Sequence, residues 1–206
     1  MTVSIVEYGV GNVGSVLNMI KRVGGTAKPV GTPGDLRAAT KILLPGVGSF
    51  DVAMSRLKQQ GLDGPLREKA TEGVPLLGIC LGMQLLASSS EEGRLPGLGL
   101  VPGTVRRFRF EDQRADVGLK IPHMGWNGAT AVREHAVVKG LETGARFYFV
   151  HSYHYMPDDP SDELLRSTYG YSFVSGIQRR NVLGVQFHPE KSHKYGMQLL
   201  KNFAEL

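Results

Sequence analysis

Short apolar runs that end in a glycine turn and continue into a helical pattern restrict the fold of this chain more than any other feature. TVSIVEY predicts a strand, and VGSVLNMIKRVGG, beyond a glycine turn, repeats apolar residues at the spacing of an amphipathic helix. KILLP and PLLGI predict two further buried strands, each leading through glycines into a helix, the first of which begins at Ser49 or Asp51 and ends near Gly61. Apolar strands that alternate with helices predict a parallel sheet covered on both faces.

The second half of the chain has a different pattern. Five segments are strand-like, punctuated by glycine and not separated by helices: VPGTVRRFRF, NGATAV, RFYFVHSYHYM, YSFVSGIQ and NVLGVQF. A helix returns at SHKYGMQLLKNFAEL, with Met197, Leu200 and Phe203 expected on its inner face. Because no long linker divides the 206 residues, we expect one α/β domain over residues 1–206, with a largely parallel central sheet flanked by helices and a strand-rich second half.

The composition is that of an ordinary globular protein. Hydrophobic residues make up 41% and charged residues 21% of the chain, which is enough for a full core without a bias towards disorder. The single cysteine cannot form an internal disulfide, the first residues do not have the pattern of a signal peptide, and VPLLGICLGMQLLA is too short to span a bilayer. We therefore expect a cytoplasmic location and no membrane partner.

A net charge of +5 raises the question of a polyanionic partner. The strongest candidate segment is RRFRF, residues 106–110, where arginine and phenylalanine alternate. A half-buried strand with Phe108 and Phe110 inward and Arg107 and Arg109 in solvent has the same pattern, and a modest excess of charge keeps many proteins in solution. We favour the strand and expect no nucleic-acid partner.

The only cysteine lies between two glycines at the end of an apolar run. GICLG, residues 78–82, has the layout of the G-x-S-x-G nucleophile elbow, with sulfur in place of the hydroxyl. At the start of a helix, Cys80 would face unpaired N–H groups and the positive end of the helix dipole, which favour the thiolate. The alternative is a cysteine buried as a small hydrophobic residue, but packing alone does not require a glycine on both sides.

A base for this nucleophile is offered by VLGVQFHPE, residues 182–190. Residues two apart on an extended backbone point the same way, and Pro189 stiffens the segment, so Glu190 can bond one nitrogen of His188 and leave the other for Cys80. An oxyanion hole needs backbone N–H groups, and Leu81 and the glycine turn PGVG are the candidate sources. PGVG could equally be an ordinary strand-to-helix turn.

A metal site is the other chemistry to consider. His151 and His154 lie close in sequence, but no nearby cysteine or carboxylate completes a set of ligands. We therefore expect no metal and no cofactor.

The stretches PGVGSF, GICLGMQLL and VQFHPEKS, in this order, resemble class I (triad) glutamine amidotransferases, whose flavodoxin-like glutaminase domains hydrolyse glutamine to glutamate and ammonia. Within that family, YGVGNVGSV, IPHMGWN and YFVHSYH are similar to the glutaminase subunits of imidazole glycerol phosphate synthases, which act in histidine biosynthesis. The resemblance covers essentially the whole chain.

The resemblance implies a role for particular residues. Cys80 would be the nucleophile, His188 the general base and acid, and Glu190 the orienting carboxylate. It assigns the oxyanion hole to Gly46, Val47, Gly48 and Leu81, and the contacts with glutamine to Gly48, Leu81, Gln84, Glu92, Ser152 and Tyr153. Glu92 would suit the substrate ammonium, although Glu91 beside it could serve instead.

The resemblance also implies a partner. One domain of this length leaves no room for an ammonia acceptor, and in the resembled subfamily the acceptor lies in a (β/α)8 barrel cyclase subunit that completes a heterodimer. Docking is expected from Asn12, Met124, Trp126, Tyr148 and His151. Trp126 could instead belong to the core, and the role of His154 stays open.

Two other functions deserve comparison. The chain could be the glutaminase of another ammonia-dependent synthase of the same fold, which IPHMGWN and the absence of a fused synthase domain disfavour. It could also be a non-catalytic interaction or sensor module, which the intact Cys80, His188 and Glu190 disfavour.

Overall fold

The structure is a computed structural model that describes residues 2–110, 118–141 and 144–206. Its main sheet begins with parallel strands in the order β2 (Thr26–Val30), β1 (Thr2–Val6), β3 (Ile42–Gly46), β4 (Leu76–Cys80) and β13 (Val182–Val185). This is the strand order of a doubly wound, flavodoxin-like sheet. The expected fold class is therefore confirmed.

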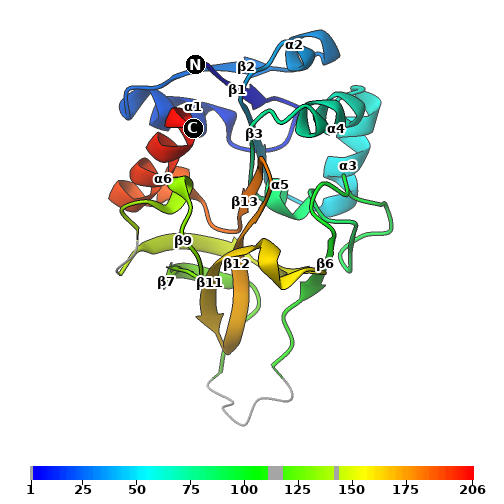
Figure 1. Ribbon diagram of the computed structural model, residues 1–206. Helices are drawn as coiled ribbons and strands as arrows, with labels where there is room; N and C mark the ends of the chain where they lie inside the picture. The colour runs from blue at the N-terminus through cyan, green and yellow to red at the C-terminus, as the bar shows by residue number, and fades with distance from the viewer. Residues whose placement is uncertain (1, 111–117, 142–143) are drawn as a thin grey trace.

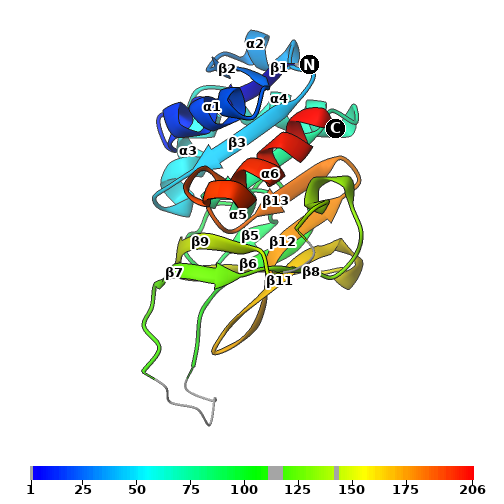
Figure 2. The same ribbon diagram turned by 90° about the vertical axis from the view of Figure 1, so that its left-hand side faces the viewer.

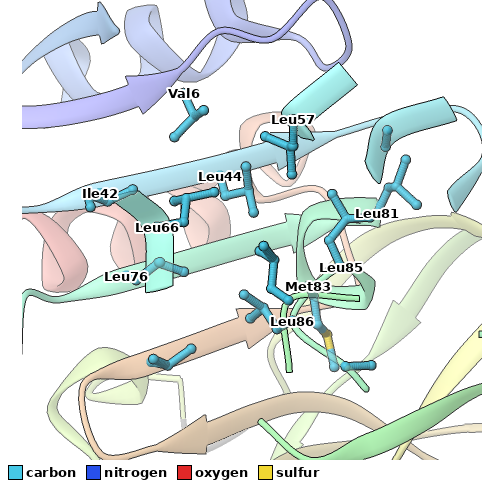
Figure 3. Close-up of a cluster of buried hydrophobic side chains, with 14 of the residues drawn as sticks. Val6, Ile42, Leu44, Leu57, Leu66, Leu76, Leu81, Met83, Leu85 and Leu86 are labelled. Atoms are coloured by element: carbon cyan, nitrogen blue, oxygen red, sulfur yellow. The ribbon is translucent and has the colours of Figure 1, made fainter. Parts of the chain in front are cut away.

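Helices cover both faces of this parallel region (Figure 1). On one face lie α1 (Val13–Arg22) and α6 (His193–Glu205), and on the other lie α3 (Phe50–Gln59) and α4 (Asp63–Thr71). The short helix α2 (Pro33–Arg37) packs near α4. Apolar side chains fill both interfaces, and Figure 3 shows the α3–α4 side, where Leu57 and Leu66 approach Leu44 of β3 and Leu76 of β4.

Beyond β13 the sheet becomes mostly antiparallel. It continues through β12 (Tyr171–Arg179), β10 (Tyr153–Pro157), β6 (Gly103–Arg107) and β5 (Ser89–Ser90), while β11 (Glu163–Tyr169) pairs with β12 and with β8 (Thr130–Ala131). A separate antiparallel pair, β7 (His123–Gly128) and β9 (Arg146–His151), lies below α6 (Figure 2). One-turn 3-10 helices occupy Ala136–Val138, Pro160–Asp162 and Pro189–Lys191.

Most predicted elements are present, with local differences. The helix after PGVG begins directly after Ser49, as expected. The helix after Cys80, α5 (Leu81–Gln84), is shorter than the LGMQLLASSS pattern predicts, because the chain then turns into the core, where Leu85 and Leu86 are fully buried. The sequence patterns did not predict six of the elements, namely β2, α2, α4, β5, β7 and β11.

Two predictions of side-chain direction can be compared with the structure. In RRFRF, β6 ends at Arg107, but Phe108 is buried, Phe110 is half-buried, and both Arg107 and Arg109 are exposed, as predicted. On α6, Leu200 and Phe203 are buried, whereas Met197 is only partly buried; Leu199 takes a fully buried place instead.

None of the helices within the described ranges is long and apolar enough to cross a membrane.

Candidate active site

Three neighbouring parallel strands end at the candidate site. β4 pairs with β3 on one side and with β13 on the other. Because the carboxyl ends of parallel strands meet at one edge of a sheet, this order brings together the residues that follow the three strands. The PGVG turn, Cys80 and His188 therefore become neighbours although they lie far apart in the sequence, and all three contribute to one pocket.

Cys80 occupies the sharp turn expected of a nucleophile elbow. It is the last residue of β4 and precedes α5 with φ 54° and ψ −112°, a backbone conformation that is strained for a residue with a side chain. The flanking glycines allow close packing here: a Cβ on Gly82 would lie 1.9 Å from the carbonyl oxygen of Leu44. The Cys80 side chain is nevertheless part of the pocket wall, with the residue 7% exposed.

His188 and Glu190 form the predicted hydrogen-bonded pair. The distance from His188 Nδ1 to Glu190 Oε1 is 2.7 Å, and both side chains are 3% exposed. Burial alone would lower the pKa of His188, but its interactions with Cys80 and with the Glu190 carboxylate outweigh burial and raise that pKa to about 10. The imidazole is therefore protonated at neutral pH. Its Nε2 has no hydrogen bond of standard geometry with any described residue, and Cys80 is the group that contributes most to the rise of its pKa, through hydrogen bonding first and charge second.

The PGVG turn lies directly beside the nucleophile. Gly46 is paired with Cys80 in the β3–β4 register, and Gly48 has φ 99°, a conformation that favours glycine. The Tyr8 hydroxyl donates a 2.8 Å hydrogen bond to the carbonyl oxygen of Pro45 and so anchors the start of the turn. Burial, and secondarily the charge of Cys80, raises the pKa of Tyr8, which keeps this hydroxyl protonated as a donor.

A pocket of about 330 Å³ opens in front of Cys80 and His188. Every residue expected to contact glutamine lines it, namely Gly48, Leu81, Gln84, Glu92, Ser152 and Tyr153, as does the oxyanion candidate Val47. The Gln84 amide nitrogen donates to the carbonyl oxygen of Tyr153 at 3.2 Å and to Gln186 Oε1 at 3.0 Å. Both Gln84 N–H groups are thereby used, which leaves its oxygen as an acceptor for a ligand.

The choice between Glu91 and Glu92 is decided by the direction of the side chains. Glu91 bonds the backbone N–H of Arg107 at 2.9 Å and the Arg109 guanidinium at 3.1 Å, away from the pocket. Glu92 lines the pocket and accepts from the backbone N–H of Phe50 at 3.0 Å. Desolvation by burial is the main reason why the pKa of Glu92 is raised, so a cation in the pocket would favour its charged form.

Three buried histidines form an aromatic cluster, and one of them, His151, also lines the pocket. His151 Nδ1 lies 2.7 Å from the carbonyl oxygen of Tyr153, and His151 Nε2 lies 3.0 Å from His123 Nδ1. His154 packs against Phe108, with ring centroids 4.9 Å apart. Mainly because of burial, the pKa falls to about 4 for His123, about 3 for His151 and about 4 for His154. All three are therefore neutral at neutral pH, and no group of three or more metal-binding side chains occurs among the described residues.

This cluster predicts a loss of stability in acid. The three histidines stay neutral in the folded chain down to about pH 4, whereas in the unfolded chain they bind protons below about pH 6.5. Their stabilising contribution is thus complete above pH 6.5 and lost as the pH falls. Near pH 5 the three together should make the free energy of unfolding fall by roughly 4 kcal/mol per pH unit. Denaturant unfolding across pH 4.5–7 measures this slope.

A matched variant identifies the source of the slope. His154→Phe keeps an aromatic ring in the cluster and should reduce the histidine contribution by about one third, because one titrating group of three is removed. If the free energy of unfolding of this variant changed with pH as steeply as that of the wild type, His154 would not be a histidine that takes up a proton when the chain unfolds.

The expected docking residues differ in their exposure. Met124 and Trp126 on β7 are 62% and 42% exposed, and Tyr148 lies opposite Trp126 on β9. Residues directly opposite in an antiparallel pair share one side, so these three form a single surface, called the β7–β9 face below. Trp126 therefore does not belong to the core; it stacks on His193 at 5.3 Å. Asn12 is exposed and caps α1. His151 is different, because its side chain is 6% exposed and lies behind this face.

Sequence reasoning did not identify Tyr8, His123 or Gln186 as neighbours of the site. All three lie within motifs of the sequence, namely YGVGNVGSV, IPHMGWN and VQFHPEKS, but nothing in their spacing shows that Tyr8 would bond the PGVG turn or Gln186 the nucleophile. His123 contacts His151 only through the cross-strand register of β7 and β9, in which the two residues are paired. These contacts depend on strand order, which the local pattern does not specify.

Comparison with known proteins identifies the family of this chain. The family model described as glutamine amidotransferase class-I matches residues 9–206. The chain belongs to this family. Among curated class I relatives, "Imidazole glycerol phosphate synthase subunit HisH 2" of Pseudomonas aeruginosa is 49% identical over 98% of each chain. "Imidazole glycerol phosphate synthase subunit HisH" of Bdellovibrio bacteriovorus is 49% identical over 99% of this chain and all of the other.

Solved structures support the same amidotransferase fold. PurLQS from Thermotoga maritima gives a TM-score of 0.75 at 19% identity, covering 99% of this chain and 97% of that one. A glutamine amidotransferase crystal structure gives a TM-score of 0.70 at 20% identity, covering 98% and 99%. At these identities the likeness concerns the fold alone, whereas the full-length relatives support the narrower assignment proposed below.

Proposed function

We propose that this chain is the glutaminase subunit of an imidazole glycerol phosphate synthase. It hydrolyses glutamine to glutamate and ammonia and supplies the ammonia to a (β/α)8 barrel cyclase subunit, which forms imidazole glycerol phosphate and aminoimidazole carboxamide ribotide. The observation that carries the proposal is the pocket in which Cys80 meets His188, itself bonded to Glu190 at 2.7 Å. The full-length relatives named as subunits of this synthase support the choice of partner.

The first half of the reaction forms a thioester. The Cys80 sulfur attacks the side-chain amide carbon of glutamine, and the negative charge that develops on the amide oxygen is stabilised by backbone N–H groups of Leu81 and of the PGVG turn, Gly46, Val47 and Gly48. The protonated His188, with its pKa raised to about 10, gives its proton to the departing ammonia. Glu190 holds the ring in the orientation that directs Nε2 towards the reacting atoms.

The second half releases glutamate. Once ammonia has left, the neutral His188 takes a proton from a water molecule, which attacks the thioester carbon. The bond to sulfur breaks, and Cys80 returns as thiolate beside the reprotonated imidazole. Glu92 and the free oxygen of Gln84 are acceptors on the pocket wall that suit the ammonium of the amino acid, while Ser152 and Tyr153 line the same pocket.

Labelling with a glutamine-analogue electrophile tests this assignment. A diazoketone analogue of glutamine should modify Cys80 at low reagent concentration and at no second residue. Added glutamine should slow this modification, because both molecules bind in the same pocket. Peptide mass spectrometry locates the adduct. An unmodified Cys80, or labelling that glutamine does not reduce, would count against a glutaminase and favour a non-catalytic module of the same fold.

The β7–β9 face is the proposed docking surface for the cyclase subunit. It exposes Met124 and Trp126 on one side of β7, and the carbonyl oxygen of Tyr148 accepts a 2.9 Å hydrogen bond from the His188 backbone N–H. β9 therefore belongs to the β7–β9 face through Tyr148 and also contacts the catalytic histidine. Asn12 is proposed as a further contact, whereas the buried His151 would act only from behind the surface.

Replacement of Trp126 by alanine should weaken the complex with the cyclase. Loss of an exposed tryptophan at the centre of an interface typically costs about 2 kcal/mol or more, so the dissociation constant should rise at least about 30-fold. Val132→Ala, which shortens another exposed apolar side chain outside this face, is the matched control and should leave binding unchanged. Calorimetry with the purified cyclase subunit measures both. Equal affinities would place the interface elsewhere.

A glutaminase serving another synthase is the alternative, and the partner distinguishes the two. With glutamine as the nitrogen source, this chain should drive product formation by the cyclase of histidine biosynthesis and not by a synthase of anthranilate or guanylate. We also propose a cytoplasmic location.

A further inference from the structure

A buried glutamine contacts the nucleophile, and neither the triad nor the glutamine contacts described above include it. Gln186 follows β13 two residues before His188 and is 0% exposed. Its backbone N–H donates to the carbonyl oxygen of Ser175 at 2.9 Å, which fixes the main chain at this point. A buried amide side chain must find partners on both of its ends.

The orientation of the Gln186 amide follows from its neighbours. The carbonyl oxygen of Tyr153 can only accept, so the atom of Gln84 that faces it is the amide nitrogen. That same nitrogen lies 3.0 Å from Gln186, so the atom of Gln186 towards Gln84 is the oxygen. The Gln186 NH₂ group is left facing the other way, where Cys80 Sγ lies 3.8 Å from Nε2.

We propose that Gln186 is a positioning residue for the nucleophile, whose side-chain N–H holds the Cys80 sulfur and favours its thiolate form. This inference rests on the proposed function. A neutral N–H donor lowers the energy of an adjacent anion without adding a charge of its own. Gln186 thus complements His188, which supplies the positive charge, and it joins the sulfur to Gln84 on the pocket wall.

Other groups around the sulfur must be considered before any change with pH is assigned to Gln186. His188 and, behind it, Glu190 approach from the segment after β13, and Tyr8 approaches from the segment after β1. The other titratable groups that line the same pocket are Glu92, His151 and Tyr153. The sulfur and His188 interact, so the ionisation observed belongs to the pair. A comparison of variants that leave all these groups unchanged isolates the contribution of Gln186.

Alkylation of Cys80, the only cysteine, by iodoacetamide measures the thiolate directly and needs no glutamine. The variants are Gln186→Met, which removes both the donor and the acceptor, and Gln186→Glu, which keeps the shape and the acceptor for Gln84. The pH midpoint of the alkylation rate should rise by about 0.5–1 unit in Gln186→Met, as expected for one lost hydrogen bond to an anion, and by at least as much in Gln186→Glu. Gln60→Met, at an exposed glutamine after α3, should retain the wild-type midpoint.

Steady-state glutaminase kinetics separate the two ends of the amide. Gln186→Glu should lower kcat while the KM for glutamine stays near the wild-type value, because Gln84 keeps its acceptor. Gln186→Met should lower kcat and also raise KM. A merely structural role would change the melting temperature of both variants but not the alkylation midpoint.

The outcomes are distinguishable. Folded Gln186→Met and Gln186→Glu with the wild-type midpoint would overturn the role of Gln186 and leave the proposed glutaminase intact. A wild-type Cys80 that alkylates no faster than the thiol of a short peptide at neutral pH would overturn both. A raised midpoint in both variants, with the control unchanged, supports the positioning role.

Discussion

Cys80→Ala should abolish glutamine hydrolysis. The sulfur is the group that forms the proposed covalent intermediate, a thioester, and removal of a nucleophile typically leaves activity at least about 10⁴-fold lower. The backbone should tolerate the change, because alanine has nearly the same size and the same difficulty at φ 54°. Glutamate release by the complex with the cyclase subunit measures the loss.

Two controls accompany this variant. The same complex supplied with an ammonium salt in place of glutamine should still form imidazole glycerol phosphate, because the cyclase does not depend on the sulfur. The melting temperature should remain close to that of the wild type. Residual glutaminase above about 1% of wild type would require a different nucleophile and would contradict the proposed mechanism.

Gly82→Ala should strongly lower the stability of the protein. The added Cβ would lie 1.9 Å from the carbonyl oxygen of Leu44 and 2.9 Å from its carbonyl carbon, and neither backbone atom can move without separating α5 from β3. Overpacking against rigid backbone costs on the order of 3 kcal/mol, measured as a fall in the midpoint of denaturant unfolding.

Gly64→Ala is the matched control for this substitution. Gly64 lies in α4, and a Cβ there would meet no atom within 4 Å. Alanine should therefore change the free energy of unfolding by no more than about 0.5 kcal/mol, because the site has room for a Cβ, while its place in the first turn directly before Pro65 removes the advantage that alanine has in a helix interior. Equal unfolding midpoints for Gly82→Ala and the wild type would mean that α5 does not approach β3 as closely as the structure has it.

The missed elements have physical causes in the sequence. In β2, TAKPV has only Val30 buried, so the apolar signal of a strand is absent and only pairing with β1 reveals it. In α4, only Pro65 and Leu66 are buried, which gives little helical periodicity. After Cys80 the sequence predicts too much helix. The mostly apolar residues 81–87 are buried and suggest a long helix, although α5 ends at Gln84.

The candidate site was predictable to the extent that it is local. The glycines around Cys80 and the stiff His188-Pro189-Glu190 segment each indicate a local geometry from adjacent residues alone. The structure has the expected turn at Cys80 and the 2.7 Å hydrogen bond between His188 Nδ1 and Glu190 Oε1. Adjacent residues such as Glu91 and Glu92 cannot be separated in this way. Both are polar and both sit in a loop, and only the positions of Arg107 and Phe50 decide which of them faces the pocket.

By itself, the sequence determined the alternation of buried strands and helices and the chemical identity of the three groups at their ends, because periodicity, glycine turns and the inventory of nucleophile, base and carboxylate are local properties. Tertiary structure alone decided that β13 lies beside β4, and therefore that His188 and Gln186 reach the sulfur of Cys80. It also decided that Trp126 is exposed while His151 is buried. Strand order and register arise from contacts between residues distant in sequence, which a local pattern does not encode.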